Sequence, residues 1–347
     1  MKTVLVCAAQ APFITGGAEI LVSELKANLE RRGFRADVAA VPFKWYPVSE
    51  IVRQALAWRL LDVTESNGTP VDLVIPTKFP SFLVRHPRKV AWLFHQHREA
   101  YDLQGTPYCS FTDSPEDRQV REAIQTMDTA SLSECREVFT ISRNVASRLS
   151  RYNGLHGTPL YPPPHHLGRY RHDEYGDYLF YAGRLDGLKR LDLAIDAMKR
   201  VRSKARLKIA GTGPLEAELR KQIQGLGVED RVELVGFVSA DDLVSLYAGC
   251  RAAYYAPFNE DYGYVTVEAF LSRKPVLTTT DAGGPLEFVS PGETGLVAEP
   301  APEAIAAAID ELWSLPEARL REMGEAGFDR VRGINWDHVI DRLTEGL

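Results

Sequence analysis

Short runs of β-branched and aromatic residues alternate along the chain with longer stretches in which apolar residues recur at helical spacing. In the first half the strand-like runs cover residues 3–8, 36–41, 71–76, 90–94 and 138–142, and helical patterns cover about 18–32, 49–61 and 143–152. Regular alternation of this kind predicts βαβ units built on a parallel sheet. We therefore expect an α/β fold.

A proline run divides this pattern in two. Tyr161-Pro162-Pro163-Pro164 continues neither a helix nor an inner strand, because proline fixes φ and lacks an amide donor. The alternation then restarts, with strand-like runs at 178–182, 207–210, 232–234, 252–255 and 275–279. A chain of 347 residues also exceeds what one core usually holds. We predict two Rossmann-like domains, residues 1–162 and 163–330.

The net charge and its distribution along the chain limit the kinds of partner that we expect. The formal net charge is −6, and residues 1–160 carry 19 Lys and Arg against 17 Asp and Glu, whereas residues 161–347 carry 22 against 30. No long basic run marks nucleic-acid binding, so a nucleic acid is not an expected partner. The small basic excess of the first half indicates a solvated surface, with peripheral contact to an anionic membrane as the alternative.

Cysteine spacing and apolar runs indicate the compartment. The cysteines Cys7, Cys109, Cys135 and Cys250 form no close pair, which favours reduced thiols over a disulfide framework or a zinc site. No apolar run reaches the roughly 18 residues of a membrane span, and the N-terminal segment has the pattern of a first strand and not of a leader. We expect a cytoplasmic protein, with attachment to the inner face of a membrane as the alternative.

Three glycine-containing loops follow predicted strands, at the positions where open parallel sheets bind ligands. They contain Gly16-Gly17, then Gly183-Arg184 with Lys189 five residues on, and then Gly211-Thr212-Gly213. Glycine lets backbone amides approach an anion closely, and an Arg with a Lys suits a diphosphate. Each loop alone is equally well explained as a tight turn or as a solvated loop.

Two glutamates eight positions apart give the strongest local signal. Glu260 lies in a predicted loop, and a helix predicted from about Tyr264 places Glu268 one turn inside it. Such carboxylates can each accept from a pair of vicinal hydroxyls, one pair on a hexose and one on a ribose, while amides at the helix start face a phosphate. This arrangement indicates a nucleotide-sugar site. The alternative is one helix-end charge and one surface acid.

His95 directly follows the strand-like run at 90–94 and would face the same ligand. A hydrogen-bonded structural histidine is the alternative for this position.

Together these stretches resemble glycosyltransferase family 4, the large retaining group with a GT-B fold, in which two Rossmann-like domains face each other across a cleft. The resemblance spans most of the chain and implies that a final helix, within 331–347, crosses back to the N-terminal domain. Its motifs follow in order: Gly16-Gly17, His95, Thr140-Ile141-Ser142-Arg143-Asn144-Val145, Gly183-Arg184 with Lys189, Gly211-x-Gly213-Pro214, Val235-Gly236-Phe237, Glu260-x7-Glu268, Lys274-Pro275, Gly283-Gly284 and Asn335-Trp336.

The resemblance implies roles for individual residues. Arg184 and Lys189 hold the donor's diphosphate, Glu268 holds the ribose, and Glu260 holds hydroxyls of the transferred sugar. His95 contacts that sugar from the other domain, so His95, Glu260, Arg184 and Lys189 are the expected catalytic residues. Further donor-binding residues implied by the resemblance are Gly16, Gly17, Gly211, Gly213, Phe237, Asp261, Tyr262, Gly263, Tyr264 and Val265.

A reaction without metal or other cofactor is also implied. The sequence has no Asp-x-Asp motif, and Arg184 and Lys189 would neutralise charge on the departing nucleotide diphosphate, a task that divalent cations perform in other transferases. Retention in the family is explained by front-face attack, in which the leaving phosphate helps to take the acceptor's proton.

The expected partners are a nucleotide-sugar donor and a glycan, lipid-linked or small-molecule acceptor. His95 with Arg98, and Glu260-Asp261-Tyr262-Gly263, resemble bacterial mannosyltransferases that use GDP-mannose, although Tyr262 and Gln96-His97 depart from that pattern. GDP-mannose is thus one candidate donor. Loops at 9–15 and 44–49, with Phe13, Trp45 and Tyr46, either stack on an acceptor or pack locally. A nucleotide-sugar 2-epimerase and a non-catalytic nucleotide-sugar-binding protein are the alternative functions.

Overall fold

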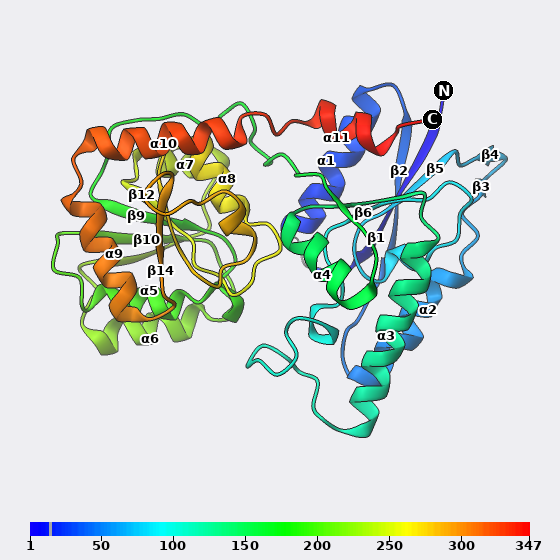
Figure 1. Cartoon of the computed structure of the whole chain (residues 1–347), viewed down its shortest axis with the longest axis horizontal. Coiled ribbons are helices and arrows are strands. Elements are labelled where there is room, and N and C mark those ends of the chain that lie inside the picture. Colours follow the sequence, from blue (N-terminus) through cyan, green and yellow to red (C-terminus); the bar gives the residue numbers. More distant parts are fainter. Residues whose placement is uncertain (14–15) are drawn as a thin grey trace. The chain divides into compact units, whose positions relative to one another are not determined.

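The computed structural model describes residues 1–13 and 16–347, and these fall into two compact units (Figure 1). Unit 1 consists of Met1–His165 together with Ile334–Leu347, and unit 2 consists of His166–Gly333. The proline run at 161–164 thus lies at the end of the first stretch of unit 1. Ile14 and Thr15, in one of the loops expected to face the acceptor, lie outside the described residues.

Unit 1 is built on parallel strands. One group of three strands has the order β2-β1-β5 and another has the order β6-β7-β8. Isolated parallel bridges from Val74 to Lys89 and from Lys78 to His95 connect the two groups. A short antiparallel hairpin, β3 and β4, stands apart from them. The strands are β1 (Thr3–Gln10), β2 (Arg35–Pro42), β3 (Glu65–Ser66), β4 (Thr69–Pro70), β5 (Leu73–Pro76), β6 (Val90–Leu93), β7 (Glu137–Thr140) and β8 (Thr158–Pro159).

Helices cover this sheet, and α1 packs against α11 while α2 packs against α3 (Figure 1). The core between them includes Trp58, Trp92 and Phe139, whose side chains are fully buried. The helices are α1 (Gly17–Arg31), α2 (Ile51–Leu60), α3 (Pro115–Ser133), α4 (Arg143–Asn153) and α11 (Trp336–Leu343).

The helix α11 belongs to unit 1 although it follows unit 2 in the chain. Asn335 caps it, because its side chain accepts a hydrogen bond from the His338 amide at 2.8 Å. The ring of Trp336 meets that of Trp92 edge to face, with centroids 6.1 Å apart. Arg32 at the end of α1 pairs with Asp337 at 2.9 Å.

Unit 2 has one sheet of six parallel strands in the order β11-β10-β9-β12-β13-β14. The helices α5, α6 and α9 cover one face, and α7, α8 and α10 cover the other (Figure 1). The strands are β9 (Tyr178–Ala182), β10 (Arg206–Ala210), β11 (Val232–Gly236), β12 (Ala252–Tyr254), β13 (Val276–Thr279) and β14 (Gly295–Ala298). The helices are α5 (Leu191–Met198), α6 (Glu216–Leu226), α7 (Ala240–Gly249), α8 (Tyr264–Leu271), α9 (Pro302–Ser314) and α10 (Glu317–Val331).

The order of strands brings the predicted loops together. In unit 2 the chain starts in the middle of the sheet at β9, moves outward to β11, and then crosses to β12 on the other side of β9. The loops after β9, β10, β12 and β13 therefore lie at one edge, the carboxyl ends of the strands. The predicted α/β class with parallel sheets is confirmed.

Candidate functional site

Lys189 and Glu260 form the centre of the candidate site in unit 2. Lys189 ends a 3-10 turn after β9, and Glu260 lies in the loop between β12 and α8. The Lys189 Nζ atom lies 2.5 Å from Glu260 Oε2 and 3.5 Å from Tyr255 Oη. The two charged side chains remain 18 % and 19 % exposed. An ion pair thus joins two strand ends that are 71 residues apart in the chain.

Lys189 is held in its cationic form. Burial is the largest single effect and acts to lower the pKa of this lysine, but attraction to Glu260, Tyr181 and Asp186 together outweighs burial, and the pKa of Lys189 is raised above its ordinary value. A partly exposed lysine that stays charged at neutral pH offers a phosphate oxygen both a positive charge and hydrogen-bond donors.

Arg184 is placed differently from Lys189. Its side chain is 53 % exposed, and its Nε atom lies 3.9 Å from Asp186 Oδ2. The backbone beneath it is fixed, because the Tyr181 hydroxyl donates to the Arg184 carbonyl at 2.9 Å. The guanidinium therefore reaches into solvent from an ordered loop. Of the two predicted diphosphate ligands, one is paired and partly buried and one is exposed.

The loop that carries Glu260 is supported by the loop after β13. The Glu260 amide donates to the Ala282 carbonyl at 2.8 Å, and the Gly284 amide donates to the Glu260 carbonyl at 2.7 Å. A Cβ atom at Gly284 would lie 2.6 Å from the Tyr262 carbonyl oxygen, so only glycine fits there. The Gly283-Gly284 motif therefore supports the backbone of Glu260.

Gly263 caps the start of α8 with a positive φ of 92°. A Cβ atom there would lie 2.8 Å from Tyr255 Cε1. The Tyr262 ring is buried and meets the Tyr264 ring edge to face, with centroids 5.1 Å apart. Because the ring of Tyr262 packs in the core, this residue can serve a ligand through its backbone only. Tyr264 and Val265 are the first residues of the helix, the end at which the helix dipole favours an anion.

Glu268 lies in α8 and meets a tyrosine from α7. The Tyr247 hydroxyl donates to Glu268 Oε2 at 2.8 Å, and Tyr247 is fully buried. Burial and then the Glu268 charge raise the pKa of Tyr247 well above its ordinary value, so Tyr247 remains a hydrogen-bond donor. The carboxylate predicted to bind ribose is thus oriented by the buried hydroxyl of Tyr247.

The glycines after β10 are explained by packing against the loop after β9. A Cβ atom at Gly211 would lie 1.9 Å from the Gly183 carbonyl oxygen, and one at Gly213 would lie 2.4 Å from the Leu185 carbonyl oxygen. The Gly183 and Leu185 amides donate to Ala210 and Thr212 carbonyls. These glycines are required by the fold whether or not a donor contacts them.

Phe237 follows β11 at the same edge of the sheet and is 85 % exposed. An aromatic ring exposed to this degree has a flat apolar face that is available for stacking.

In unit 1, His95 follows β6 and its Nδ1 atom lies 2.9 Å from the Gln96 carbonyl oxygen. Gln96 is fully buried and donates to Asn153 at 2.5 Å. His97 packs between the rings of Phe79 and Phe111, with centroids 5.5 and 5.8 Å away. Burial lowers the pKa of His97 to about 4, so this imidazole is neutral. Gln96 therefore belongs to the core, and His97 packs against aromatic rings.

Gly16 and Gly17 begin α1 as predicted. The Gly16 amide donates to Glu19 Oε2 at 2.9 Å, and Glu19 Oε1 pairs with Lys78 Nζ at 2.6 Å. Burial acts to raise the pKa of Glu19, but the hydrogen bond and charge of Lys78 together with backbone hydrogen bonds, including that from Gly16, outweigh burial, and the pKa of Glu19 is lowered. A Cβ atom at Gly16 would lie at the ordinary distance of 3.4 Å from Glu19 Oε2, so packing does not require glycine at this position.

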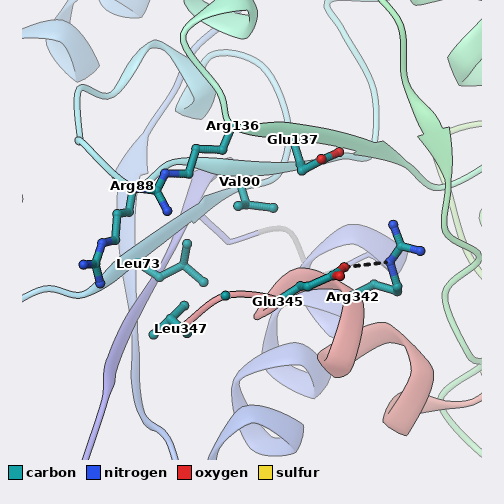
Figure 2. Close-up of a pocket in the computed structure, with 9 residues that line it drawn as sticks. Leu73, Arg88, Val90, Arg136, Glu137, Arg342, Glu345 and Leu347 are labelled. Carbon is teal, nitrogen blue, oxygen red and sulfur yellow. Dashed lines mark ion pairs between the residues drawn. The ribbon is translucent and has the colours of Figure 1, made fainter.

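Unit 1 contains two pockets, one away from the predicted donor residues and one lined by Ala18 and Glu19, next to Gly16 and Gly17. One, of about 110 Å³, lies at the amino ends of β5 and β6 beside α11 and is lined by Leu73, Val90, Arg88, Arg136 and Arg342 (Figure 2). Arg342 lies 3.5 Å from Glu345. The other, of about 240 Å³, lies between α1 and β2. Both are smaller than the roughly 300 Å³ or more of a typical ligand pocket.

Sequence reasoning missed two residues of the site. Tyr255 follows β12 and places its hydroxyl beside Lys189, and Arg190 is buried directly after Lys189. Tyr255 could have been found from its position at a strand end. Arg190 gave no signal of its own, because a charged residue at the start of a helix is usually exposed.

The arrangement of acidic, histidine and cysteine side chains bears on metal binding, and the composition of the helices bears on membrane spanning. Within residues 1–13 and 16–347, no group of three or more His, Cys, Asp or Glu side chains is arranged to hold a metal ion. Over the same residues, every helix is too short or too polar to cross a bilayer.

Comparison with known proteins shows what unit 2 is similar to. Residues 167–330 match the family described as glycosyl transferases group 1. An uncharacterised glycosyltransferase of Methanocaldococcus jannaschii is 29 % identical over 164 residues, 46 % of this chain and 42 % of that protein. The α-1,3/1,6-mannosyltransferase ALG2 of Mus musculus is 34 % identical over 129 residues, 37 % of this chain and 31 % of that protein. The chain thus spans less than half the length of these curated relatives.

Solved structures identify the fold. A sucrose-phosphate synthase of Thermosynechococcus elongatus superposes with a TM-score of 0.80 at 19 % identity, covering 99 % of this chain and 97 % of that one. The lipopolysaccharide glycosyltransferase WaaG gives a TM-score of 0.74 at 15 % identity, covering 99 % and 100 %. The chain therefore has the GT-B fold, and this prediction is confirmed.

Proposed function

We propose that this chain is a glycosyltransferase that moves a hexose from a nucleotide-diphosphate sugar to a glycan, lipid-linked or small-molecule acceptor. The observation that carries the proposal is the Lys189–Glu260 pair, which sits at the strand ends of the region that matches glycosyl transferases group 1. Because the pKa of Lys189 is raised, this lysine stays positively charged at neutral pH. The Glu260 carboxylate beside it can accept hydrogen bonds from sugar hydroxyls, so the site offers a cation and an acceptor side by side.

Four side chains divide the work in this proposal. Arg184 and Lys189 neutralise the diphosphate, Glu268 accepts from the ribose hydroxyls, and Glu260 accepts from hydroxyls of the transferred sugar. The exposed guanidinium of Arg184 and the Glu268 carboxylate that Tyr247 orients support these roles. His95 would contact the sugar from unit 1.

The proposed reaction is retaining and needs no metal. The bond between the anomeric carbon and the phosphate oxygen breaks, the acceptor oxygen forms its bond on the same face, and the acceptor's proton passes to the leaving phosphate. Arg184 and Lys189 stabilise the negative charge that develops on that phosphate. No further cofactor takes part.

The proposed donor is GDP-mannose, and the acceptor class stays open among the three named. A relative over 129 residues is named as a mannosyltransferase, which supports mannose as the first sugar to test. Trp45 and Tyr46 are 39 % and 57 % exposed in unit 1, so either an acceptor sugar or a peripheral membrane contact could use them.

Thermal-shift screening tests the donor. The full chain is incubated with GDP-, UDP-, ADP- and dTDP-sugars, with and without EDTA. Binding to the folded state raises the melting temperature by mass action, and a true donor should do so in EDTA as well. A shift that disappears with EDTA would contradict the metal-free reaction, and no shift with any donor would contradict the proposal.

Substitution of the pair tests the mechanism. Lys189→Ala should lower transfer at least about 100-fold, the usual scale for a lost charge-stabilising group. Lys208→Ala is the matched control, because Lys208 also faces a glutamate in unit 2, Glu233 at 3.8 Å, but from the middle of β10. Isomerisation of the donor without an acceptor would identify an epimerase instead, and wild-type turnover in Lys189→Ala would refute the diphosphate role.

A further inference from the structure

We propose that Arg190 is a positioning residue that sets the distance between Lys189 and Glu260. The meaning of that distance for catalysis rests on the proposed function. The placement itself follows from the hydrogen bonds of Arg190.

The Arg190 guanidinium is only 8 % exposed and binds two other strand ends of the sheet. It donates to the carbonyls of Ala256 at 3.0 Å and Pro257 at 2.8 Å, just after β12. It donates to Thr279 Oγ1 at 2.9 Å, the last residue of β13. Both guanidinium ends bind the Asp281 carboxylate at 2.7 Å. Since Arg190 itself follows β9, one side chain connects three strand ends.

These contacts lead directly to Glu260. The Asn259 amide donates to the Asp281 carbonyl at 2.8 Å, one residue before Glu260. The Ala256 and Pro257 carbonyls belong to the same loop, which enters the site at Phe258, whose amide donates to the Leu188 carbonyl at 2.8 Å. Arg190 therefore holds the Glu260 loop in two ways. It binds the Ala256 and Pro257 carbonyls within the loop, and it binds Asp281, whose carbonyl accepts from the Asn259 amide.

The backbone of Arg190 is also unusual. Its φ is +49°, in the left-handed region that residues other than glycine rarely adopt. Such a conformation persists only where the surroundings determine it, and it is often found at functional sites. At this backbone conformation the Lys189 side chain contacts Glu260, while the side chain of Arg190 contacts the Ala256 and Pro257 carbonyls of the same loop.

A purely structural arginine offers a comparison. Arg231 donates to the carbonyls of Met198, Val201, Ser203 and Ala205, and it precedes β11 at the opposite edge of the sheet. Its bonds resemble those of Arg190 in kind, but none of them leads to a residue of the candidate site. Arg231→Gln is thus the matched control for Arg190→Gln.

The test measures the reactivity of Lys189 in the full chain. Trace acetylation with acetic anhydride, followed by mass spectrometry of the Lys189 peptide, reports how firmly Glu260 protects the amine. The Glu260→Gln variant gives the acetylation rate of Lys189 in the absence of the Glu260 charge. Arg190→Gln and the milder Asp281→Asn should each raise the Lys189 rate severalfold toward that value, and Arg231→Gln should leave it unchanged, because contacts that share one network are coupled.

Unchanged Lys189 reactivity in both Arg190→Gln and Asp281→Asn would overturn the inference, and so would a Glu260→Gln rate equal to wild type. Steady-state transfer supplies the second readout: Arg190→Gln should lower kcat about tenfold or more with a smaller change in donor KM, since a displaced group loses transition-state contacts. Absence of transfer in the wild type would contradict the proposed function alone, because the acetylation result decides the role of Arg190 without a donor.

Discussion

At the scale of single residues, the number and type of partners separate lysines and arginines of the core from those of the site. Lys89 is fully buried and donates to three carbonyls and to Glu134, so its hydrogen bonds serve the fold. Lys189 has a carboxylate and a tyrosine hydroxyl beside it and stays partly exposed. A buried polar group that is fully paired stabilises, whereas a partly exposed pair can exchange partners with a ligand.

The sequence predicts that Lys189 and Glu260 lie at the same edge of the sheet in unit 2, because both follow predicted strands. It could not predict that they contact each other, since that contact depends on the strand order, in which β12 lies beside β9. It also could not separate Gly16, which packing does not require, from Gly211, which packing does require. Such distinctions come from neighbours that are distant in the chain.

Asp128 supports a prediction about pH. It is fully buried, its Oδ2 accepts from Tyr101 Oη at 2.6 Å, and Oδ1 has no hydrogen-bond partner within the described part of the chain. Burial raises the pKa of Asp128 well above its ordinary value. The unfolded chain releases this proton near pH 4 and the folded chain retains it, so the contribution of Asp128 to stability is greatest below pH 4 and falls as pH rises toward the folded pKa.

Asp128→Asn should therefore raise the free energy of unfolding by about 1–3 kcal/mol at pH 7 and change it little at pH 4. Urea denaturation at the two pH values measures both numbers. Asp113→Asn, at an exposed position of the same unit, is the control and should leave the pH dependence as it is. Equal effects of Asp128→Asn at both pH values would show that the carboxyl does not titrate as argued.

At the scale of elements, the periodic pattern predicted many of the longer elements and none of the two-residue strands. The strand at 178–182 and the helix starting at Tyr264 appear as predicted. The two-residue strands β3, β4 and β8 were not predicted, because two residues carry no period. The helix α9 was not predicted either, although Ile305, Ile309 and Leu312 have helical spacing and could have revealed it.

The contact between the loops after β9 and β10 gives a prediction at this scale. Gly211→Ala would place a Cβ atom 1.9 Å from the Gly183 carbonyl oxygen, at a backbone φ of +125°. Both effects oppose the native loop, so we expect a loss of about 2–4 kcal/mol in the free energy of unfolding.

Gly225→Ala is the matched control, because it lies in α6 and has nothing within 4 Å of its added Cβ atom. It should raise the free energy of unfolding by about 0.5–1 kcal/mol. Urea denaturation of both variants compares them directly. Similar stabilities for the two alanine variants would refute the loop contact.

At the scale of the whole molecule, the chain has two units that each own a core and a sheet. Unit 1 is completed by Ile334–Leu347, in which Trp336, Val339, Ile340 and Leu343 are buried. The resemblance implied that a final helix returns to the N-terminal domain, and α11 is grouped with unit 1. The pattern of the helix itself shows only that one face is apolar, and not which unit covers it.

Trp336→Ala should therefore destabilise unit 1 and leave unit 2 unchanged. Removal of a buried aromatic side chain costs about 3–5 kcal/mol, which would lower one of two calorimetric transitions. Trp45→Ala, at a position that is 39 % exposed in the same unit, is the control and should shift neither transition appreciably. A shift of the unit 2 transition by Trp336→Ala would contradict this division of the chain.

The return of α11 to unit 1 also sets an order of maturation during synthesis. Residues 166–333 are continuous, so unit 2 can fold as soon as they leave the ribosome, whereas unit 1 must wait for residues 334–347. Domains usually mature in the order of synthesis, and here the unit that begins the chain is completed last. Until then the side of Trp92 that Trp336 covers in the folded chain lacks this partner.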